Sequence, residues 1–335
     1  MDLIFCTLFD SNFIDKGLTL YQSMQKHLED FRLYVFAFDQ RCFEILKKEN
    51  LPNMVVVSLE EFETEALLKV KNERTRAEYC WTCSPWIIKH VLDRYQEPIC
   101  TYIDADMQFF STPQPVFDEM KERNCSVIIV PHRFKNKEEE IKAHNEVGSY
   151  CVEFNTFLND ENGYRTLSWW ANRCLEWCFY AVPGTTEWYG DQKYLNAFPE
   201  MFDGVMICEH YGVGFAPWNI SLVEYAGEEE GVPYISVKKT GKKFPVVIYH
   251  FENVSYLSEH ILHASSRTNS KELHAAIYDS YIKSLIHNRK IIEEKYEFKL
   301  SKAKRVVTKN PLMALYQKYI SPLRRVKHLR DLYWV

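Results

Sequence analysis

Short apolar runs alternate with amphipathic segments along much of the chain. Apolar runs bounded by turn residues predict strands, and apolar residues at helical spacing predict the helices between them. The predicted strands are residues 3–8, 31–38, 54–58, 99–103, 126–131, 152–158, 205–208 and 245–249, and the predicted helices are residues 16–28, 41–50, 78–95, 115–123 and 163–180. This alternation, clearest in the first half, is typical of an α/β protein with a parallel sheet.

Three segments complete this prediction. The helix over residues 78–95 has an alternative start at Ser84-Pro85, because serine caps helices and proline suits a first turn. The highly charged residues 134–146 are predicted to be a solvated loop or a lid. After Leu257 the pattern is helical to about Leu300.

The composition is that of a soluble globular protein. Of the 335 residues 46% are hydrophobic and 26% are charged, so the chain can bury a substantial core. The ten cysteines are scattered, mostly inside apolar runs. The first residues lack the basic start of a secretory signal, and no apolar run approaches the ~18 residues of a spanning helix. We therefore expect a cytoplasmic protein with reduced, buried cysteines.

The net charge of −5 conceals a basic C-terminus. From residue 299 onward only Asp331 is acidic, and the basic residues are Lys299, Lys302, Lys304, Arg305, Lys309, Lys318, Arg324, Arg325, Lys327 and Arg330. A nucleic-acid binder would carry its positive charge on the folded domain, so nucleic acid is not an expected partner. The mixture of basic and aromatic residues predicts that the tail contacts the anionic inner face of a membrane. The alternative is a tail that packs on the acidic body or on a second subunit.

Two carboxylates close the predicted strand 99–103, since Asp104 and Asp106 follow it with one residue between them. Side chains alternate between the faces of a strand, so residues two apart point the same way. Ligands of open α/β sheets bind beyond the carboxyl ends of the strands, and a divalent cation carrying a diphosphate prefers oxygen ligands. Asp104 and Asp106 are therefore candidate metal and nucleotide ligands.

Further segments accompany this Asp-x-Asp in a fixed order. They are Thr-Leu-Phe-Asp-Ser-Asn-Phe at 7–13, Gly-Asp-Gln-Lys-Tyr-Leu-Asn at 190–196, Trp-Asn at 218–219 and Val-Ile-Tyr-His-Phe at 247–251. Together the segments resemble nucleotide-sugar-dependent glycosyltransferases of the GT-A fold. The likeness is closest to the retaining glycosyltransferase family 8, which includes glycogenin and bacterial lipopolysaccharide galactosyl- and glucosyltransferases, and it covers residues 3–255.

The resemblance implies a Rossmann-like GT-A catalytic domain with a central mixed sheet at residues 1–256. A helical extension at 257–298 and the basic aromatic tail at 299–335 would follow it. The implied activity is metal-dependent transfer of a hexose, with retention, from a UDP-sugar to a hydroxyl of a glycan or glycolipid. The family usually continues its His-Phe with Gly and then Lys-Pro-Trp, whereas this chain continues with Glu252-Asn253-Val254-Ser255. The lysine that would meet the diphosphate is therefore missing from that position.

The resemblance also assigns roles to single residues. It implies that Mn²⁺ or Mg²⁺ is held by Asp104, Asp106 and His250, and that Asp191 and Gln192 lie at the reacting sugar carbon. The implied donor contacts are Thr7, Asp10, Asn12, Lys89, Asp104 and Asn155. The aromatic rings of Trp188, Tyr189 and Trp218 are candidate acceptor contacts because such rings can stack on sugar faces, and their alternative is a place in the core.

Several of these residues have a structural alternative. Asp191 could cap a helix after Gly190, Lys89 could lie on a solvated helix face, and Asn155 could make a structural hydrogen bond. Two functional alternatives also stay open. One is an inverting GT-A enzyme with Asp191 as general base, and the other is a non-catalytic domain that binds nucleotide-sugars. A nucleotidyltransferase is disfavoured, because its glycine- and arginine-rich first loop is absent.

Overall fold

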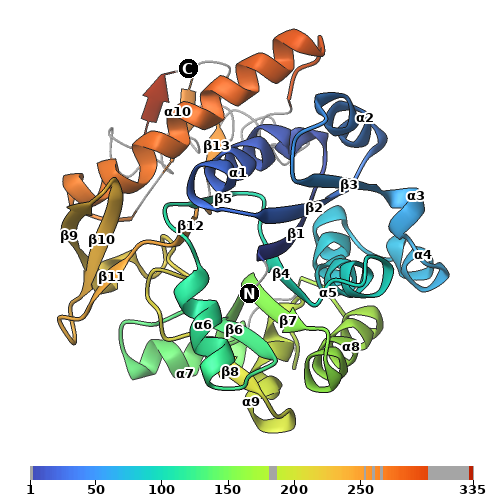
Figure 1. The fold of residues 1–335 in the computed structure, drawn as a ribbon, viewed down its shortest axis with the longest axis horizontal. Coiled ribbons are helices and arrows are strands. Elements are labelled where there is room, and N and C mark those ends of the chain that lie inside the picture. The colour runs from blue at the N-terminus through green and yellow to red at the C-terminus, as the bar shows by residue number, and fades with distance from the viewer. Residues whose placement is uncertain are drawn as a thin grey trace, which may run out of the picture.

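A seven-stranded sheet forms the centre of the molecule (Figure 1), in a computed structural model that describes residues 3–180, 187–252, 254–258, 261–264, 267–300 and 332–334. In spatial order its strands are β3 (Met54–Ser58), β2 (Phe31–Ala37), β1 (Leu3–Phe9), β4 (Ile99–Ile103), β7 (Tyr150–Leu158), β6 (Val127–Pro131) and β8 (Val205–Ile207). Neighbouring strands are parallel except at β7, which is antiparallel to both β4 and β6. The predicted α/β class is confirmed, with a mixed sheet.

The strands are apolar on both faces because helices cover both faces of the sheet. Along β1, Leu3 and Phe5 pack on the side of α1 (Ile14–His27), α2 (Gln40–Glu49) and α6 (Gln114–Glu122). Ile4 and Cys6 point the other way, toward α4 (Glu65–Lys71), α5 (Arg76–Arg94) and α8 (Glu161–Glu176). This alternation follows from the two-residue period of a strand. Short elements complete the chain: η1 (Ser11–Phe13), α3 (Leu59–Phe62), η2 (Gln192–Ala197), α9 (Phe198–Met201) and η3 (Ile220–Leu222).

Helix α5 begins at Arg76, so the alternative start at Ser84-Pro85 is wrong. Thr75 and Glu78 form a capping box, in which each side chain accepts a hydrogen bond from the backbone N–H of the other residue. Pro85 lies inside the helix, where it supplies no N–H to the preceding turn. The helix carries Trp81 and Ser84 to the edge of a cavity described below.

Residues 137–146 form helix α7 (Lys137–Glu146) and not the predicted loop. Asn136 caps the helix by accepting a hydrogen bond from the Glu139 N–H at 2.9 Å. Acidic residues in the first turn interact favourably with the positive end of the helix dipole. No residue of α7 is buried, so its apolar periodicity is weak and the helix was not predictable from pattern alone.

An antiparallel pair returns the second half of the chain to the carboxyl end of β4. Strand β5 (Met107–Phe109) pairs with β12 (Ile248–His250), which places His250 opposite Met107. A three-stranded antiparallel sheet of β9 (Val223–Glu229), β10 (Val232–Val237) and β11 (Lys243–Pro245) precedes β12. This sheet is not predicted, because its half-exposed strands carry many polar residues.

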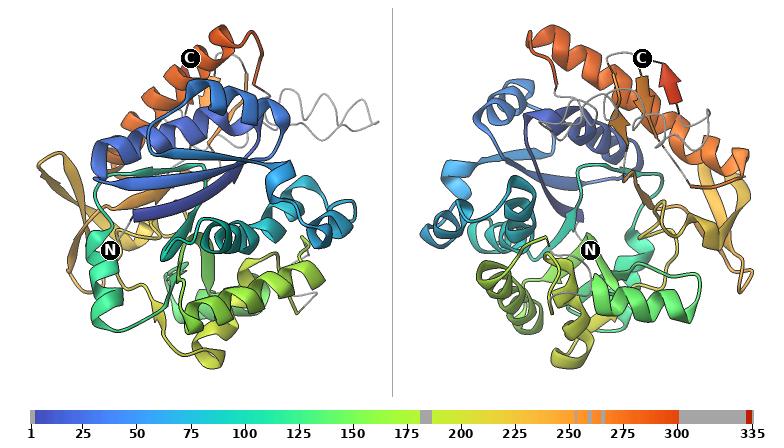
Figure 2. Two further views of the ribbon diagram at one scale, coloured as in Figure 1. Left: turned by 45° about the vertical axis from the view of Figure 1, so that its right-hand side comes forward. Right: turned by 180° about the vertical axis from the view of Figure 1, so that it is seen from behind.

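The C-terminal part contains helix α10 (Lys271–Lys295), which lies beside α1 in both views of Figure 2. It packs into the same core as β12 and Phe251, with the Tyr281 ring stacked on Phe251 at a centroid distance of 3.6 Å. On α1, Thr19 accepts a hydrogen bond from the Asn288 amide at 3.0 Å. The helix predicted after residue 257 is therefore present, but it starts later. Strands β13 (Ser255–Tyr256) and β14 (Ile261–His263) precede it.

The basic tail falls largely outside the described residues, which include Lys299 and Leu300 and then only β15 (Leu332–Trp334). Strand β15 pairs with β14 in antiparallel register. The contact of the tail with a membrane stays a prediction. Among the helices of the described residues, none has the length and apolar character required to cross a bilayer.

The stacking of Tyr281 on Phe251 predicts that α10 is an integral part of the fold. Replacing a buried aromatic ring by Ala should lower the free energy of unfolding by about 3 kcal/mol or more, as measured by urea denaturation. Tyr281→Phe is the matched control, since the buried Tyr281 hydroxyl has no hydrogen-bond partner among the described residues. Equal stability of Tyr281→Ala and Tyr281→Phe would contradict the packing.

Candidate functional site

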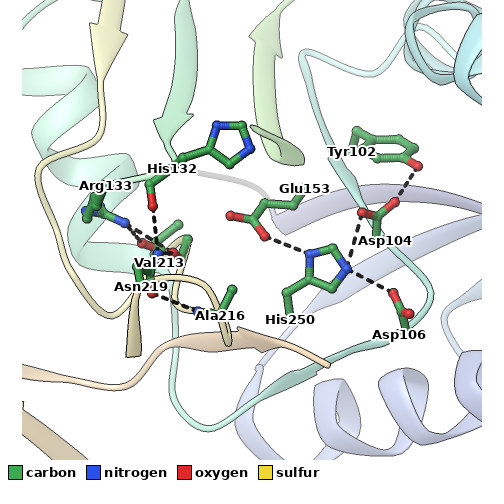
Figure 3. Close-up of polar contacts among 11 residues, drawn as sticks. Tyr102, Asp104, Asp106, His132, Arg133, Glu153, Val213, Ala216, Asn219 and His250 are labelled. Atoms are coloured by element: carbon green, nitrogen blue, oxygen red, sulfur yellow. Dashed lines mark hydrogen bonds and ion pairs between the residues drawn. The ribbon is translucent and has the colours of Figure 1, made fainter. Parts of the chain in front are cut away.

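Two aspartates and a histidine converge at the carboxyl end of β4. Asp104 and Asp106 lie in the turn between β4 and β5, and β12 brings His250 beside them. One ligand atom from each residue lies within 4.8 Å of the other two. The His250 Nε2 atom is 3.2 Å from Asp106 Oδ1 and 3.7 Å from Asp104 Oδ2 (Figure 3). The structure thus brings together the three predicted metal ligands.

Each of these side chains is held by a further polar group. The Tyr102 hydroxyl donates to Asp104 Oδ1 at 2.7 Å, and the Lys16 ammonium lies 3.2 Å from Asp106 Oδ2. The other imidazole nitrogen of His250, Nδ1, lies 2.8 Å from Glu153 Oε2. Three carboxylates therefore surround one imidazole.

The charges of the cluster shift one another's pKa values. Burial raises the pKa of Asp104 to about 6, and the charge of Asp106 adds to the rise. Burial acts on Asp106 in the same direction, but Lys16 and His250 outweigh it and hold the Asp106 pKa well below its usual range. Burial would lower the pKa of His250, but the neighbouring Asp106 and Glu153 raise it well above its usual value. The cluster thus attracts positive charge.

The donor set fits a divalent cation. Carboxylate oxygens suit Mg²⁺ and Mn²⁺, and one imidazole nitrogen beside them is a plausible addition for Mn²⁺. In this chain Asp104, Asp106 and His250 would hold the ion.

Two adjoining cavities meet at this cluster. One, of about 420 Å³, is lined by Leu8, Phe9, Asp10, Phe13, Phe38, Arg76, Ala77, Cys80, Trp81, Tyr102, Asp104, Ala105 and Asp106. We call it the first cavity. The second cavity, of about 380 Å³, is lined by Trp81, Ser84, Tyr102, Asp104, His132, Val147, Cys151, Val152, Tyr189, Gly190, Asp191, Gln192, Trp218, His250 and Glu252. Trp81, Tyr102 and Asp104 line both.

Asp191 lies in the second cavity and is 5% exposed. Its backbone is fixed by the Trp170 indole N–H, which donates to the Asp191 carbonyl at 2.9 Å. It precedes η2 but its side chain makes no capping hydrogen bond, so the helix-cap alternative is wrong. Burial raises the pKa of Asp191 to about 7, and the nearby charge of Asp104 contributes to the rise.

Other predicted residues surround Asp191. The Gln192 amide donates to the Val147 carbonyl at 2.8 Å, which fixes the orientation of the amide. Tyr189 and Trp218 line the second cavity, and the centroid of the Trp218 ring lies 5.4 Å from that of the His250 ring. Asn219 holds this loop in place, because its amide donates to the His132 carbonyl at 3.0 Å.

Two predicted residues lie beside the cavities and do not line them. The Trp188 ring stacks on the Tyr194 ring, with the two ring centroids 4.5 Å apart. Asn155 is buried in β7 opposite Tyr102 of β4, and its amide atoms have no hydrogen-bond partner among the described residues.

Of the predicted contacts to the nucleoside and the donor phosphates, Asp10 lines the first cavity, whereas Thr7, Asn12 and Lys89 do not. Asp10 lines the first cavity, accepts a hydrogen bond from the Asn12 N–H at 2.8 Å and pairs with Arg76 at 2.5 Å. Thr7 is buried inside β1 and does not line the cavity. Lys89 is not brought to the site. It pairs with Asp93 and Tyr164 and lines a different cavity, because its position on α5 faces α8.

Several residues of the site are absent from the prediction. Glu153 carries a detectable signal, since a charged residue inside an apolar strand needs a partner. Lys16, Arg76 and His132 carry no such signal, because lysine, arginine and histidine are ordinary in helices and loops. Their contribution depends on contacts between distant segments.

The mixed sheet makes this an α/β protein, and both the sheet and the Asp-Asp-His cluster at the end of β4 have the arrangement that the resemblance to GT-A enzymes implies. No family model matches the chain. Two similar proteins of Bacillus subtilis strain 168 are named uncharacterized protein YfnD and uncharacterized protein YfnF. YfnD is 30% identical over 256 residues, which cover 76% of this chain and 79% of YfnD. The chain therefore belongs to the family of YfnD.

YfnF is 28% identical over 305 residues, which cover 88% of this chain and 97% of YfnF. A similar solved structure is that of the galactosyltransferase LgtC in complex with donor and acceptor sugar analogues. It has a TM-score of 0.49 and 12% identity, and it covers 85% of this chain and 95% of LgtC. At this distance, the activity of the chain has to be inferred from its own residues.

The cluster predicts that the protein binds Mn²⁺ through Asp106. Asp106→Asn should raise the Mn²⁺ dissociation constant more than about 100-fold, because the loss of even an outer partner of a ligand costs 10–100-fold. The free Mn²⁺ signal in electron paramagnetic resonance measures this constant. Asp118→Asn, at an exposed position on α6, is the control. Equal Mn²⁺ affinity of both variants would contradict the site.

The raised pKa of Asp191 predicts a pH-dependent stability cost. Its pKa is about 7 in the folded chain and 3.8 in the reference state. As pH rises from about 4 to 7, the unfolded chain ionises first and wild type loses stability, at about 1.4 kcal/mol for each pKa unit. In EDTA, the free energy of unfolding of Asp191→Asn minus that of wild type should therefore increase between pH 4 and 7 and stay constant above pH 8. A difference that does not vary with pH in urea denaturation would refute the shift.

Proposed function

We propose that this protein is a metal-dependent glycosyltransferase that moves a hexose from a UDP-sugar to a hydroxyl of a glycan or glycolipid. The observation that carries the proposal is the position of the Asp104, Asp106 and His250 cluster where two cavities meet. Such a transfer needs a site for a nucleotide, a site for a sugar and a positive charge between them. In this chain the two cavities would take the nucleotide and the sugar, and a cation held by the cluster would supply the positive charge between them.

The first cavity suits a nucleoside. The aromatic rings of Phe13, Phe38 and Trp81 form much of its wall and would pack against a base. Asp10 and Arg76 are the charged groups on this wall apart from the metal cluster, and the Asp10 carboxylate is a suitable acceptor for ribose hydroxyls. This arrangement supports a nucleotide donor, and uracil is the base that the sequence resemblance implies.

The diphosphate would lie between the two cavities. A bound Mn²⁺ or Mg²⁺ would neutralise the negative charge that builds up on the diphosphate as the sugar leaves. The Lys16 ammonium, from the start of α1, adds a positive charge at Asp106. The family's usual lysine after His-Phe is missing here, and within the described ranges Lys16 is a cation that contacts the cluster.

The second cavity suits the transferred sugar and the acceptor hydroxyl. Asp191 would orient a sugar hydroxyl, and the carbonyl dipole of Gln192 would stabilise positive charge on the reacting carbon. An amide is a poor nucleophile, so Gln192 is assigned this electrostatic role. Trp218 and Tyr189 offer flat faces for the acceptor sugar.

One observation favours the inverting alternative. A general base works best when its pKa lies near the working pH, and burial raises the pKa of Asp191 to about 7. In an inverting enzyme Asp191 would take the proton of the attacking hydroxyl. The anomeric configuration of the product distinguishes the two mechanisms.

The proposal predicts Mn²⁺-dependent release of UDP from one or more members of a panel of UDP-sugars. Asp191→Ala should lower kcat about 100-fold or more while the UDP dissociation constant stays near the wild-type value, because Asp191 acts on the sugar and not on the nucleotide. Asp203→Ala, at an exposed position, is the control. UDP binding without turnover by wild type on every donor would favour the non-catalytic alternative.

A further inference from the structure

A charged residue is buried in the centre of the sheet directly behind the metal cluster. Glu153 lies in β7 within an apolar run and is 0% exposed. Its Oε2 atom lies 2.8 Å from His250 Nδ1, and its Oε1 atom has no hydrogen-bond partner among the described residues. Burying a carboxylate costs several kcal/mol unless its interactions compensate. Glu153 therefore destabilises the fold at this position unless its contacts compensate for its burial.

The contact with Glu153 determines how the His250 ring is used. A neutral imidazole carries its proton on one nitrogen and a lone pair on the other. With the proton on Nδ1, His250 donates to Glu153 and its Nε2 lone pair is free to bind a cation. Nε2 is the nitrogen that faces Asp106 and Asp104 (Figure 3).

A guanidinium lies near the other carboxylate oxygen of Glu153, Oε1. The Arg133 guanidinium donates to the carbonyls of Cys208, His210, Val213 and Gly214. Arg133 Nη1 and Glu153 Oε1 lie 2.8 and 3.3 Å from the point where a Cβ atom on Gly214 would stand. Gly214 has a positive φ of 69° and no side chain, so both charged groups can come close to it. Arg133 therefore adds a positive charge close to Glu153.

We propose that Glu153 is a positioning residue that makes His250 a ligand of the divalent cation. Glu153 accepts a hydrogen bond from the Nδ1–H group, fixes the plane of the imidazole and directs Nε2 at the point shared by Asp104 and Asp106. It also increases the electron density on Nε2 and so strengthens the bond to the ion. The inference rests on the proposed function only in requiring that this cluster binds a divalent cation.

Two substitutions separate the hydrogen bond from the charge. Glu153→Gln keeps the shape and an acceptor oxygen but removes the charge, and Glu153→Leu removes both. Loss of such a partner costs 10–100-fold in metal affinity. We expect the Mn²⁺ dissociation constant, measured by electron paramagnetic resonance, to rise about 10-fold in Glu153→Gln and about 100-fold in Glu153→Leu. Glu122→Gln, at an exposed position, should equal wild type.

The magnetic coupling between Mn²⁺ and the histidine nitrogen reports on the bond between them. A substitution that only lowered the stability of the fold would leave this coupling unchanged. Electron spin echo modulation should show this coupling in wild type and Glu122→Gln, and it should be weakened or lost in Glu153→Leu. Thermal unfolding in EDTA identifies variants that remain folded. Folded Glu153 variants with wild-type affinity and wild-type nitrogen coupling would overturn the inference while the proposed function stands.

Wild-type protein provides a test that needs no Glu153 variant. In ¹⁵N NMR of histidine-labelled protein saturated with Mg²⁺, the His250 signal, assigned with His250→Gln, should be that of an imidazole protonated on Nδ1. A ring protonated on Nε2 would overturn the inference even if neither Glu153 variant folds. A wild type that binds neither Mn²⁺ nor Mg²⁺ would instead remove the metal dependence from the proposed function, and the inference with it.

Discussion

The site depends on the pairing of β5 with β12. These strands are far apart in the sequence, and their register alone places His250 beside the Asp104 and Asp106 turn. The pair is continued by the Phe251 N–H, which donates to the Asp106 carbonyl at 2.9 Å. Phe251 in turn is stacked on Tyr281 of α10. The C-terminal helix therefore supports the metal cluster, although it contributes none of the three candidate ligands.

The cluster concentrates charge that a protein would otherwise keep at its surface. Three carboxylates surround His250, with Lys16 at one edge and Arg133 behind Glu153. Buried charges are tolerated when they are paired or coordinate a metal. Here Asp104, Asp106 and His250 also direct one ligand atom each at a shared position. The proposed binding of a divalent cation would use this arrangement.

Sequence reasoning found the parts of the site that follow from a single strand or motif. Asp104 and Asp106 were predictable because a strand end projects them together, and His250 because it belongs to a recognisable motif. Glu153 and Arg76 were not predicted, since their roles arise from pairing between β7, β12, α5 and the loop after β1. Lys89 was predicted at the site but lines a different cavity, because the sequence does not specify which face of α5 lies toward the cluster. Helix α7 was missed because none of its residues is buried, so its sequence has no clear apolar periodicity.

The central claim is that the turn after β4 and the end of β12 form one metal site. Anomalous diffraction from a crystal soaked with MnCl₂ and UDP tests this claim most directly. The account predicts a manganese peak bounded by the Asp104 and Asp106 carboxylates and by His250 Nε2, with density for the diphosphate beside it. A diphosphate bound at this place without manganese, or a manganese peak that does not contact His250, would contradict it.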